Sequence, residues 1–311
     1  MNKQEPLLRD NKDRFVIFPV KHNDIWDAYK AIEANLWTSG AIDIHQDLLD
    51  RQQLSEEKRL FLNKIIGLIL HSENNLNGKS TKKLSQNIKL PEAKSFFDLQ
   101  VVMENTHTET YSICLNSFLT ATEQEEIFNE IEASPATAAR EEWIKKWTNS
   151  PSFAEKLVAL ATAKSIFSYG SFATIFWIKN WGLMPGLCYA YEMIYRDKAL
   201  HRDFATQLFR DHLLENISDK KVQQIIGEAV AIEKEVISNF LPLDLIDLNA
   251  KSLNEYLDYE SNRLFTGLLV NRTSSEEEYA KESLLEKRAK NFSKSNKSDK
   301  DFNKISKNTD L

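Results

Sequence analysis

Apolar positions recur with a helical period along most of the chain. From Ile25 to Trp37 they fall near three- and four-residue spacings, and Asn23 can cap the start of this segment. The same spacing predicts further helices over residues 55–72, 91–120, 124–133, 138–148, 152–180, 186–214, 219–240 and 250–268. This helical spacing predicts an all-α fold.

Three of the predicted helices, 91–120, 152–180 and 186–214, are unusually long and carry apolar side chains on most faces. A helix that is apolar nearly all round is typical of the inside of a bundle. Pro185-Gly186 is the stop that separates the second from the third. The Asn- and Lys-rich patch from Asn74 to Lys83 predicts a loop.

The pattern also suggests how the chain is divided. We predict an extended arm over residues 1–22, one helical domain over 23–270 and a flexible tail over 271–311. In the tail the apolar period fades into a segment rich in Lys, Ser, Asn and Asp, which is typical of chain that packs no core.

Composition narrows the class of protein. The 311 residues include only 8 Gly and 7 Pro, which favours long helices over a turn-rich β fold, and 42% hydrophobic residues exclude a disordered chain. The net charge of −6 has the wrong sign for a surface that tracks nucleic acid. The two cysteines, Cys114 and Cys188, fit neither a disulfide framework nor a zinc motif. We expect a soluble cytoplasmic protein with no membrane partner.

Polar side chains interrupt the three long apolar helices at regular spacing. Burying a charge without a partner costs several kcal/mol, so these groups should contact one another. They are Glu104, His107 and Tyr111 in 91–120, Lys164 in 152–180, and Lys198 and His201 in 186–214.

A lone histidine on such a helix is most often a hydrogen-bonded core residue, and a lone lysine usually extends to solvent. Several on three helices favour a polar centre instead. Di-metal carboxylate bundles use Glu-x-x-His pairs on facing helices. Glu104 and His107 form such a pair, whereas Lys198 and His201 keep the spacing with a lysine in place of the glutamate.

Several runs of sequence follow one another in an order typical of a single protein family. They are Glu5-Pro6-Leu7-Leu8-Arg9, Arg14-Phe15-Val16-Ile17-Phe18-Pro19, Met103-Glu104-Asn105-Thr106-His107, Gly170-Ser171-Phe172-Ala173 through Ile175-Phe176-Trp177, and Gly182-Leu183-Met184-Pro185-Gly186-Leu187. On these runs, over about residues 5–292, the chain resembles the eukaryotic-type small subunit of class I ribonucleotide reductase.

The resemblance implies a ferritin-like helical bundle. Active members of the family hold a di-iron centre that generates a stable tyrosyl radical. They send that radical to the large subunit, where a thiyl radical starts the reduction of ribonucleotides to deoxyribonucleotides. The implied partners are therefore the large subunit and a second small subunit.

The family's metal ligands carry over residue by residue. The resemblance assigns ligand positions to Asp43, Glu104, His107 and His201, while Lys164 and Lys198 stand where the family has glutamate. The two lysines balance the charge of Asp43 and Glu104, and each ammonium repels a divalent cation. We therefore predict no metal cofactor.

The family's radical route carries over in the same way. Tyr111 matches the radical tyrosine, and Trp26 with Asp197 match the interior electron-transfer positions. Phe292 stands where the family has the exit tyrosine, and phenylalanine has no hydroxyl to relay a proton. Tyr256 and Tyr279 are the side chains that can replace it.

Two functional hypotheses follow from the resemblance. In the first, the chain is a catalytically degenerate small subunit that supports or regulates a catalytic paralogue in a mixed dimer. In the second, it is a metal-free radical-generating subunit that uses Tyr111, in native or modified form. An ordinary metal-dependent activity is the least favoured.

The predicted tail lacks a terminal aromatic residue, and we therefore expect its docking to the large subunit to be weak or absent.

Overall fold

The computed structural model describes residues 5–10, 14, 16–167, 169–179, 182–240 and 250–269. All of these belong to one compact unit, Met1–Thr273. The predicted tail, 271–311, lies outside the described residues.

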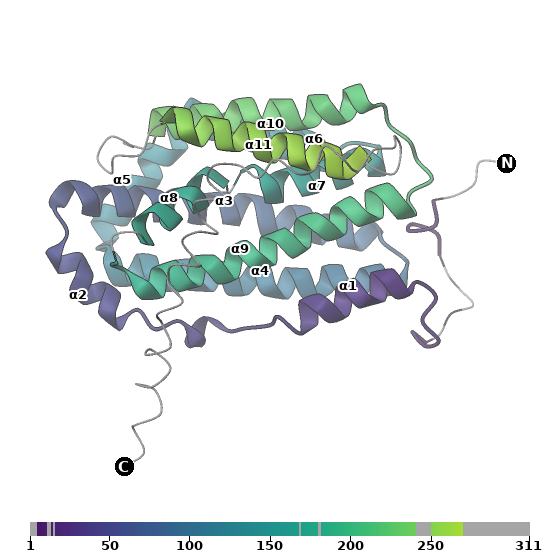
Figure 1. The fold of residues 1–311 in the computed structure, drawn as a ribbon, viewed down its shortest axis with the longest axis horizontal. Coiled ribbons are helices and arrows are strands. Elements are labelled where there is room, and N and C mark those ends of the chain that lie inside the picture. Colours follow the sequence, from purple (N-terminus) through teal and green to yellow (C-terminus); the bar gives the residue numbers. More distant parts are fainter. Residues whose placement is uncertain are drawn as a thin grey trace, which may run out of the picture. The chain divides into compact units, whose positions relative to one another are not determined.

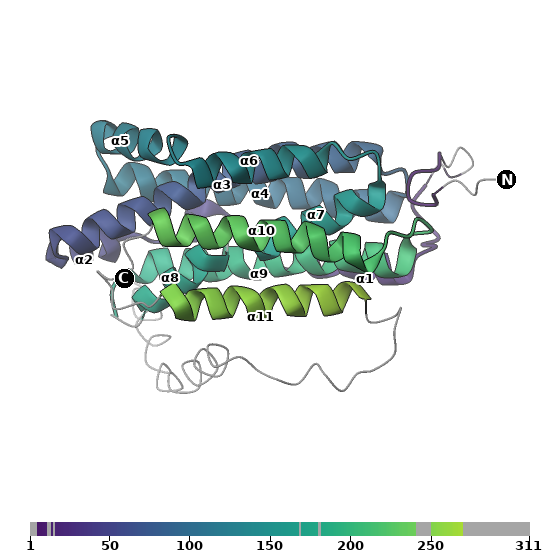
Figure 2. The same cartoon turned by 90° about the horizontal axis from the view of Figure 1, so that it is seen from above.

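The described residues form helices and no strand, which confirms the all-α prediction. The elements are α1 (Asn23–Glu33), the 3₁₀ turn η1 (Ser39–Ala41), α2 (His45–Gln53), α3 (Glu56–Asn87), α4 (Pro91–Phe118), α5 (Ala121–Glu132), α6 (Pro135–Thr148), α7 (Phe153–Ser165), α8 (Tyr169–Lys179), α9 (Pro185–Gln207), the π-helical segment η2 (Leu208–His212), α10 (Asp219–Phe240) and α11 (Ala250–Leu269). The long helices run along a common direction (Figures 1 and 2), with α3 packed on α4, α7 on α9, and α10 on α11.

Local sequence explains where several helices begin. Ser55 caps α3, and Ser152 caps α7 by accepting from the Glu155 N–H. Thr120 and Glu123 form a reciprocal capping box at the start of α5. Proline occupies the first turn of α4, α6 and α9, where its missing N–H costs no hydrogen bond.

The structure corrects the predicted loop between Asn74 and Lys83, because α3 continues through it to Asn87. Low helix propensity is overridden by packing along α4 and by side-chain anchors. Thr81 donates a hydrogen bond to Glu104 on α4, and the Ser80 and Thr148 hydroxyls lie 3.2 Å apart.

Two other predicted helices are divided, and one helix was not predicted. The segment 152–180 is two helices, α7 and α8, and 186–214 ends as α9 followed by the π-helical segment. The unpredicted helix is α2. It supplies Asp50, which accepts from the Met184 N–H at 2.8 Å, and Asp47, which accepts from the N–H groups of Gly186 and Leu187. These aspartates cap α9 from outside its own sequence.

Candidate functional site

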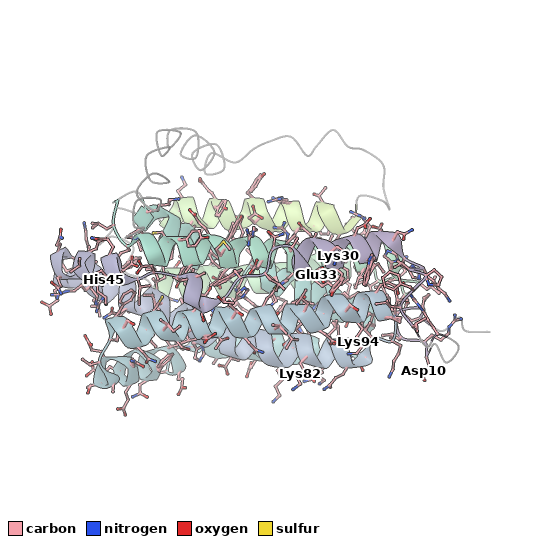
Figure 3. The ribbon with its side chains drawn as sticks, turned by 90° about the horizontal axis from the view of Figure 1, so that it is seen from below. Asp10, Lys30, Glu33, His45, Lys82 and Lys94 are labelled. Atoms are coloured by element: carbon pink, nitrogen blue, oxygen red, sulfur yellow. The ribbon has the colours of Figure 1, made fainter. Side chains whose placement is uncertain are left out.

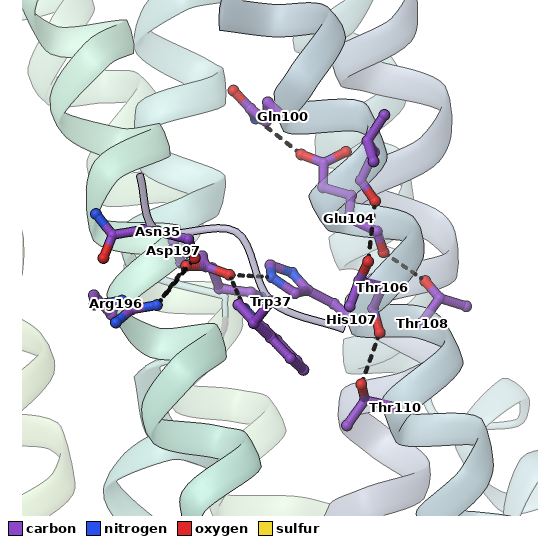
Figure 4. Close-up of polar contacts among 12 residues, drawn as sticks. Asn35, Trp37, Gln100, Glu104, Thr106, His107, Thr108, Thr110, Arg196 and Asp197 are labelled. Atoms are coloured by element: carbon purple, nitrogen blue, oxygen red, sulfur yellow. Dashed lines mark hydrogen bonds and ion pairs between the residues drawn. The ribbon is translucent and has the colours of Figure 1, made fainter. Parts of the chain in front are cut away.

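The first ion pair of the site joins α7 to α4. Lys164 Nζ lies 2.8 Å from Glu104 Oε1, and the two side chains are only 2% and 1% exposed. The same oxygen accepts hydrogen bonds from Thr81 Oγ1 at 2.9 Å and from Gln100 Nε2 at 2.8 Å. Figure 4 shows Gln100 one helical turn before Glu104 on α4. The carboxylate is therefore held by a cation and two neutral donors.

The second ion pair joins α9 to α3. Lys198 Nζ contacts Glu73 Oε1, and both side chains are buried. The ammonium also lies 5.4 Å from the centre of the Phe172 ring. Burial lowers the pKa of Lys198, and the Glu73 carboxylate opposes this shift. The two pairs together place two positive and two negative charges in the core.

Beside these pairs, Asp197 on α9 accepts two hydrogen bonds through one oxygen. Trp37 Nε1 donates to Asp197 Oδ2 at 2.7 Å, and His107 Nε2 lies 2.9 Å from the same atom. Figure 4 shows one oxygen of this carboxylate joined by dashed lines to both the indole and the imidazole. Because a carboxylate accepts, His107 Nε2 is the donor in this contact.

His201 lies on α9 with its ring centre 6.1 Å from that of His107. Burial lowers the pKa of His201 well below its usual value, and the positive charge of Lys164 lowers it further. The imidazole is therefore neutral. Neither of its ring nitrogens has a hydrogen-bond partner among the described residues.

Tyr111 is fully buried on α4, one helical turn beyond His107. Its ring centre lies 5.3 Å from that of Tyr191. Burial raises the pKa of Tyr111 well above 10, and the Glu73 carboxylate adds to the shift. The hydroxyl has no hydrogen-bond partner within the described part of the chain.

Another buried ion pair, which the sequence pattern does not predict, joins α6 to α10. Arg140 on α6 contacts both Glu233 on α10 and Ser72 on α3. Burial raises the pKa of Glu233 to about 7, and Arg140 opposes this shift. The guanidinium connects three helices around the core.

The structure brings together Glu104, His107, Lys164, Asp197, Lys198 and His201, with Tyr111 one turn away. It does not place Asp43 among them. Asp43 lies in the exposed segment before α2, and its Oδ1 accepts from the His45 N–H at 2.9 Å. Figure 3 shows His45 at the opposite end of the bundle from Asp10. The expectation that Asp43 balances one of the lysines is therefore wrong, because Glu73 does so.

Trp26 also differs from its expected place. It is half-buried on α1 and packs against Phe18 and Tyr29, with ring centres 5.8 and 4.8 Å away. The indole that donates to Asp197 is that of Trp37, whose ring also stacks on His107 at 6.0 Å. The expected pairing of Trp26 with Asp197 is corrected to Trp37. Phe292 and Tyr279 lie outside the described residues.

One signal in the sequence identifies Glu73 in retrospect. Ile66, Ile69 and Leu70 are buried at helical spacing, and Glu73 continues their face. The predicted helix ends at residue 72, one residue before Glu73, so the sequence pattern alone does not assign this carboxylate to the site.

A di-iron centre, the family norm, does not fit the donor set that the structure brings together. Lys164 and Lys198 offer ammonium groups, which have no lone pair for a metal, and both Glu73 and Glu104 are engaged by them. Among the described residues no three His, Cys, Asp or Glu side chains are arranged to hold a metal ion. His107 Nδ1 and both ring nitrogens of His201 have no hydrogen-bond partner within the described part of the chain, and they are the side-chain nitrogens left for a metal.

The helical bundle, with a buried polar centre shared by four of its helices, places this chain in the ferritin-like class. Comparisons with known proteins show the family. The model of the ribonucleotide reductase small chain matches residues 14–278. The chain belongs to the ribonucleotide reductase small chain family. This confirms both the resemblance and the ferritin-like fold.

Individual relatives agree with this family. The chain is 37% identical over 273 residues to ribonucleoside-diphosphate reductase subunit M2 of Mesocricetus auratus, covering 87% of this chain and 70% of that protein. It is 38% identical over 268 residues to the Saccharomyces cerevisiae small chain 1, covering 85% and 67%. The solved ribonucleotide reductase Rnr4 homodimer from Saccharomyces cerevisiae is 32% identical, with a TM-score of 0.81 over 93% of both chains.

No helix in the described part of the chain is both long and apolar enough to cross a membrane.

Proposed function

We propose that this protein is a metal-poor, catalytically degenerate small subunit of ribonucleoside-diphosphate reductase. In this role it supports or regulates a radical-generating small subunit in a mixed dimer. The observation that carries the proposal is the pair of buried lysines, Lys164 and Lys198, whose ammonium groups engage the carboxylates of Glu104 and Glu73. The bundle keeps its polar centre without needing a divalent cation to balance it.

Charge supports this reading. A centre with four carboxylates needs two divalent cations for neutrality, whereas Glu73 and Glu104 are already neutralised by two lysines. A divalent cation entering the site would be repelled by each ammonium and would have to displace two buried ion pairs. The residues that bind metal in active relatives would then stabilise the scaffold here.

The proposed partners are a catalytic small subunit, or a second copy of this chain, and the large subunit of the reductase in the cytoplasm. The similar Rnr4 structure is a homodimer. A mixed dimer needs only that the surface used between small subunits accept a related chain.

The direct test is to purify the chain alone, add ferrous iron and oxygen, and measure bound metal together with the electron paramagnetic resonance spectrum. We expect no stoichiometric iron and no tyrosyl signal, followed by co-purification with a catalytic small subunit when the two are expressed together. Two irons per chain with a radical would overturn the proposal. A radical on Tyr111 without metal would support the alternative of a metal-free generator.

A further inference from the structure

The short helix α2 packs on the bundle with the reverse of the usual amphipathic arrangement. Its buried side chains are two aspartates, Asp47 and Asp50, whereas Leu48 and Leu49 are 36% and 43% exposed. A surface helix ordinarily buries apolar side chains and exposes charged ones. The carboxylates of α2, and not an apolar face, therefore hold this helix against the bundle.

The two carboxylates bind backbone N–H groups at the start of α9. Asp50 Oδ2 accepts from the Met184 N–H at 2.8 Å, and Asp47 accepts from the N–H groups of Gly186 and Leu187, each at 3.2 Å. Figure 1 shows α2 at the end of the bundle where α9 begins. The N–H groups in the first turn of a helix have no partner within that helix, so α2 supplies the partners for α9.

The backbone that these carboxylates hold is strained. Met184 precedes the first turn of α9 and is fully buried, with a φ of 59° in the left-handed region. A non-glycine residue adopts this conformation only when the surrounding structure imposes it. The contacts from α2 therefore keep the start of α9 in an arrangement that the local backbone does not favour.

The carboxylates of α2 have no cation beside them. Within the described part of the chain, neither Asp47 nor Asp50 forms an ion pair with a lysine or arginine. The side chain that donates to Asp50 Oδ1 is the neutral amide of Gln46, at 2.7 Å. Both aspartates thus depend on neutral donors although they are 0% and 5% exposed.

The titratable groups that face Asp47 are all acids. They are Asp50 on α2, Asp43 in the segment before it, and the thiols of Cys114 on α4 and Cys188 on α9. Burial raises the pKa of Asp47 to about 6, and the charges of Asp50 and Asp43 add to the shift against the opposing N–H groups of α9. Ionised Asp47 is therefore poorly accommodated where it lies.

We propose that α2 is a proton-sensitive clasp on the start of α9, tightened when Asp47 is protonated and loosened when it is ionised. In the closed clasp the carboxyl group is buried, and in the open clasp α2 has moved away and the group is in water. Water stabilises the ionised carboxylate more than the protonated acid, so ionisation favours opening.

The direction of the pH effect follows from the two pKa values of Asp47, about 6 in the closed clasp and the usual 3.8 in water. The contribution of Asp47 to closure is complete below pH 3.8 and is lost as the pH rises to 6. At neutral pH, α2 is then the helix that opens most readily, and opening uncovers the start of α9. This clasp is independent of the function proposed above.

The experiment measures amide hydrogen exchange in the full-length chain at pH 5 and pH 7, with the intrinsic rate of each amide divided out. We expect the protection of Gly186 and Leu187 to fall about tenfold from pH 5 to pH 7. Phe153 and Ala154 are the internal control, because their N–H groups donate in the same way to the half-buried Glu215, at 3.0 and 3.1 Å. Their protection should be equal at the two pH values.

Asp47→Asn keeps the shape and one acceptor oxygen but removes the charge. We expect this variant to show at pH 7 at least the protection that the native chain has at pH 5, with no pH dependence. Asp27→Asn, at an exposed position on α1, is the matched control and should exchange like the native chain. Circular dichroism checks that each variant is folded.

Three results would overturn the proposal. They are equal protection of Gly186 and Leu187 at the two pH values in the native chain, a pH dependence that persists in Asp47→Asn, and lower protection in Asp47→Asn than in the native chain at pH 7. The first comparison needs no variant, so it decides the matter even if Asp47→Asn does not fold.

Discussion

Lys164 Nζ and Glu104 Oε1 lie 2.8 Å apart in the core of the bundle, although the two residues are 60 positions apart in the sequence. Thr81 and Gln100 complete the hydrogen bonding of that oxygen. A charge buried this deeply is stable only with its partner. The effects of mutating the two residues on the free energy of unfolding should therefore not be additive.

Lys164→Met should lower the free energy of unfolding by about 3–5 kcal/mol, because it leaves the Glu104 carboxylate buried without a cation. The double variant Lys164→Met/Glu104→Gln should recover most of that loss, since glutamine still accepts from Thr81 and Gln100. Urea denaturation at one fixed protein concentration measures both values.

Lys82→Met is the surface control for this pair. Lys82 is exposed on α3 and is labelled in Figure 3, so its removal should change stability by no more than about 0.5 kcal/mol. If the single and double core variants lose the same stability, Lys164 and Glu104 are not coupled.

A second prediction concerns the identity of the buried cations. Lys164→Glu/Lys198→Glu should convert the centre to four glutamates and two histidines, which is a donor set for divalent metals. We expect the variant to gain bound Mn²⁺ or Fe²⁺ and to unfold at a higher temperature when the metal is added. Elemental analysis and thermal denaturation measure these effects.

The matched control for metal binding is Lys164→Met/Lys198→Met, which removes the same two ammonium groups without adding ligands. It should bind less metal than the glutamate variant. Equal metal content in the two variants would show that the lysines only exclude metal by charge and that their positions do not supply ligands.

The third prediction is a pH dependence at the N-terminal arm. Arg14 donates to both oxygens of Glu92 at 2.7 Å, and the Lys21 N–H donates at 2.9 Å. Burial raises the pKa of Glu92, but these donors outweigh it and the pKa falls to about 2, below the unfolded value of 4.5. The pair should therefore stabilise the fold fully above pH 4.5 and lose that contribution as the pH falls towards 2.

Glu92→Gln removes this titration. The stability difference between the native chain and the variant should be about 3 kcal/mol near neutral pH and should shrink steadily below pH 4.5. Urea denaturation across a pH series is the measurement. A difference that stays constant with pH would assign the effect of the variant to packing alone.

The fourth prediction tests how α2 holds the start of α9. A Cβ at Gly186 would clash with the backbone oxygen of Asp43 and with Asp47 Oδ2. Gly186→Ala should therefore cost about 3 kcal/mol of stability. Gly227→Ala on α10 is the matched control, because nothing lies within 4 Å of its Cβ. It should increase stability by about 0.5–1 kcal/mol, since alanine favours a helix.

If Gly186→Ala were as stable as the native chain, the close approach of α2 to α9 would be contradicted. That result would mean that the segment from Asp43 to Asp47 moves away at little cost. Thermal denaturation of the two alanine variants under one condition is sufficient for this comparison.

The sequence determined the class of fold, most of the helices and the family, because helical period and ordered motifs are local properties. It also identified Glu104, His107, Lys164, Lys198 and His201 as polar groups out of place on apolar helices. Each of these was visible as an exception within its own helix, without knowledge of any neighbour.

Which of these groups pair with one another depends on how the helices pack. Glu73 rather than Asp43 balances Lys198, and Trp37 rather than Trp26 donates to Asp197. Such pairings depend on the length and rotational phase of helices that pack side by side. Low helix propensity places the end of the predicted helix before Glu73, whereas the observed α3 packs on α4 and continues to Asn87. Burying a helical face outweighs the unfavourable propensity of a few residues.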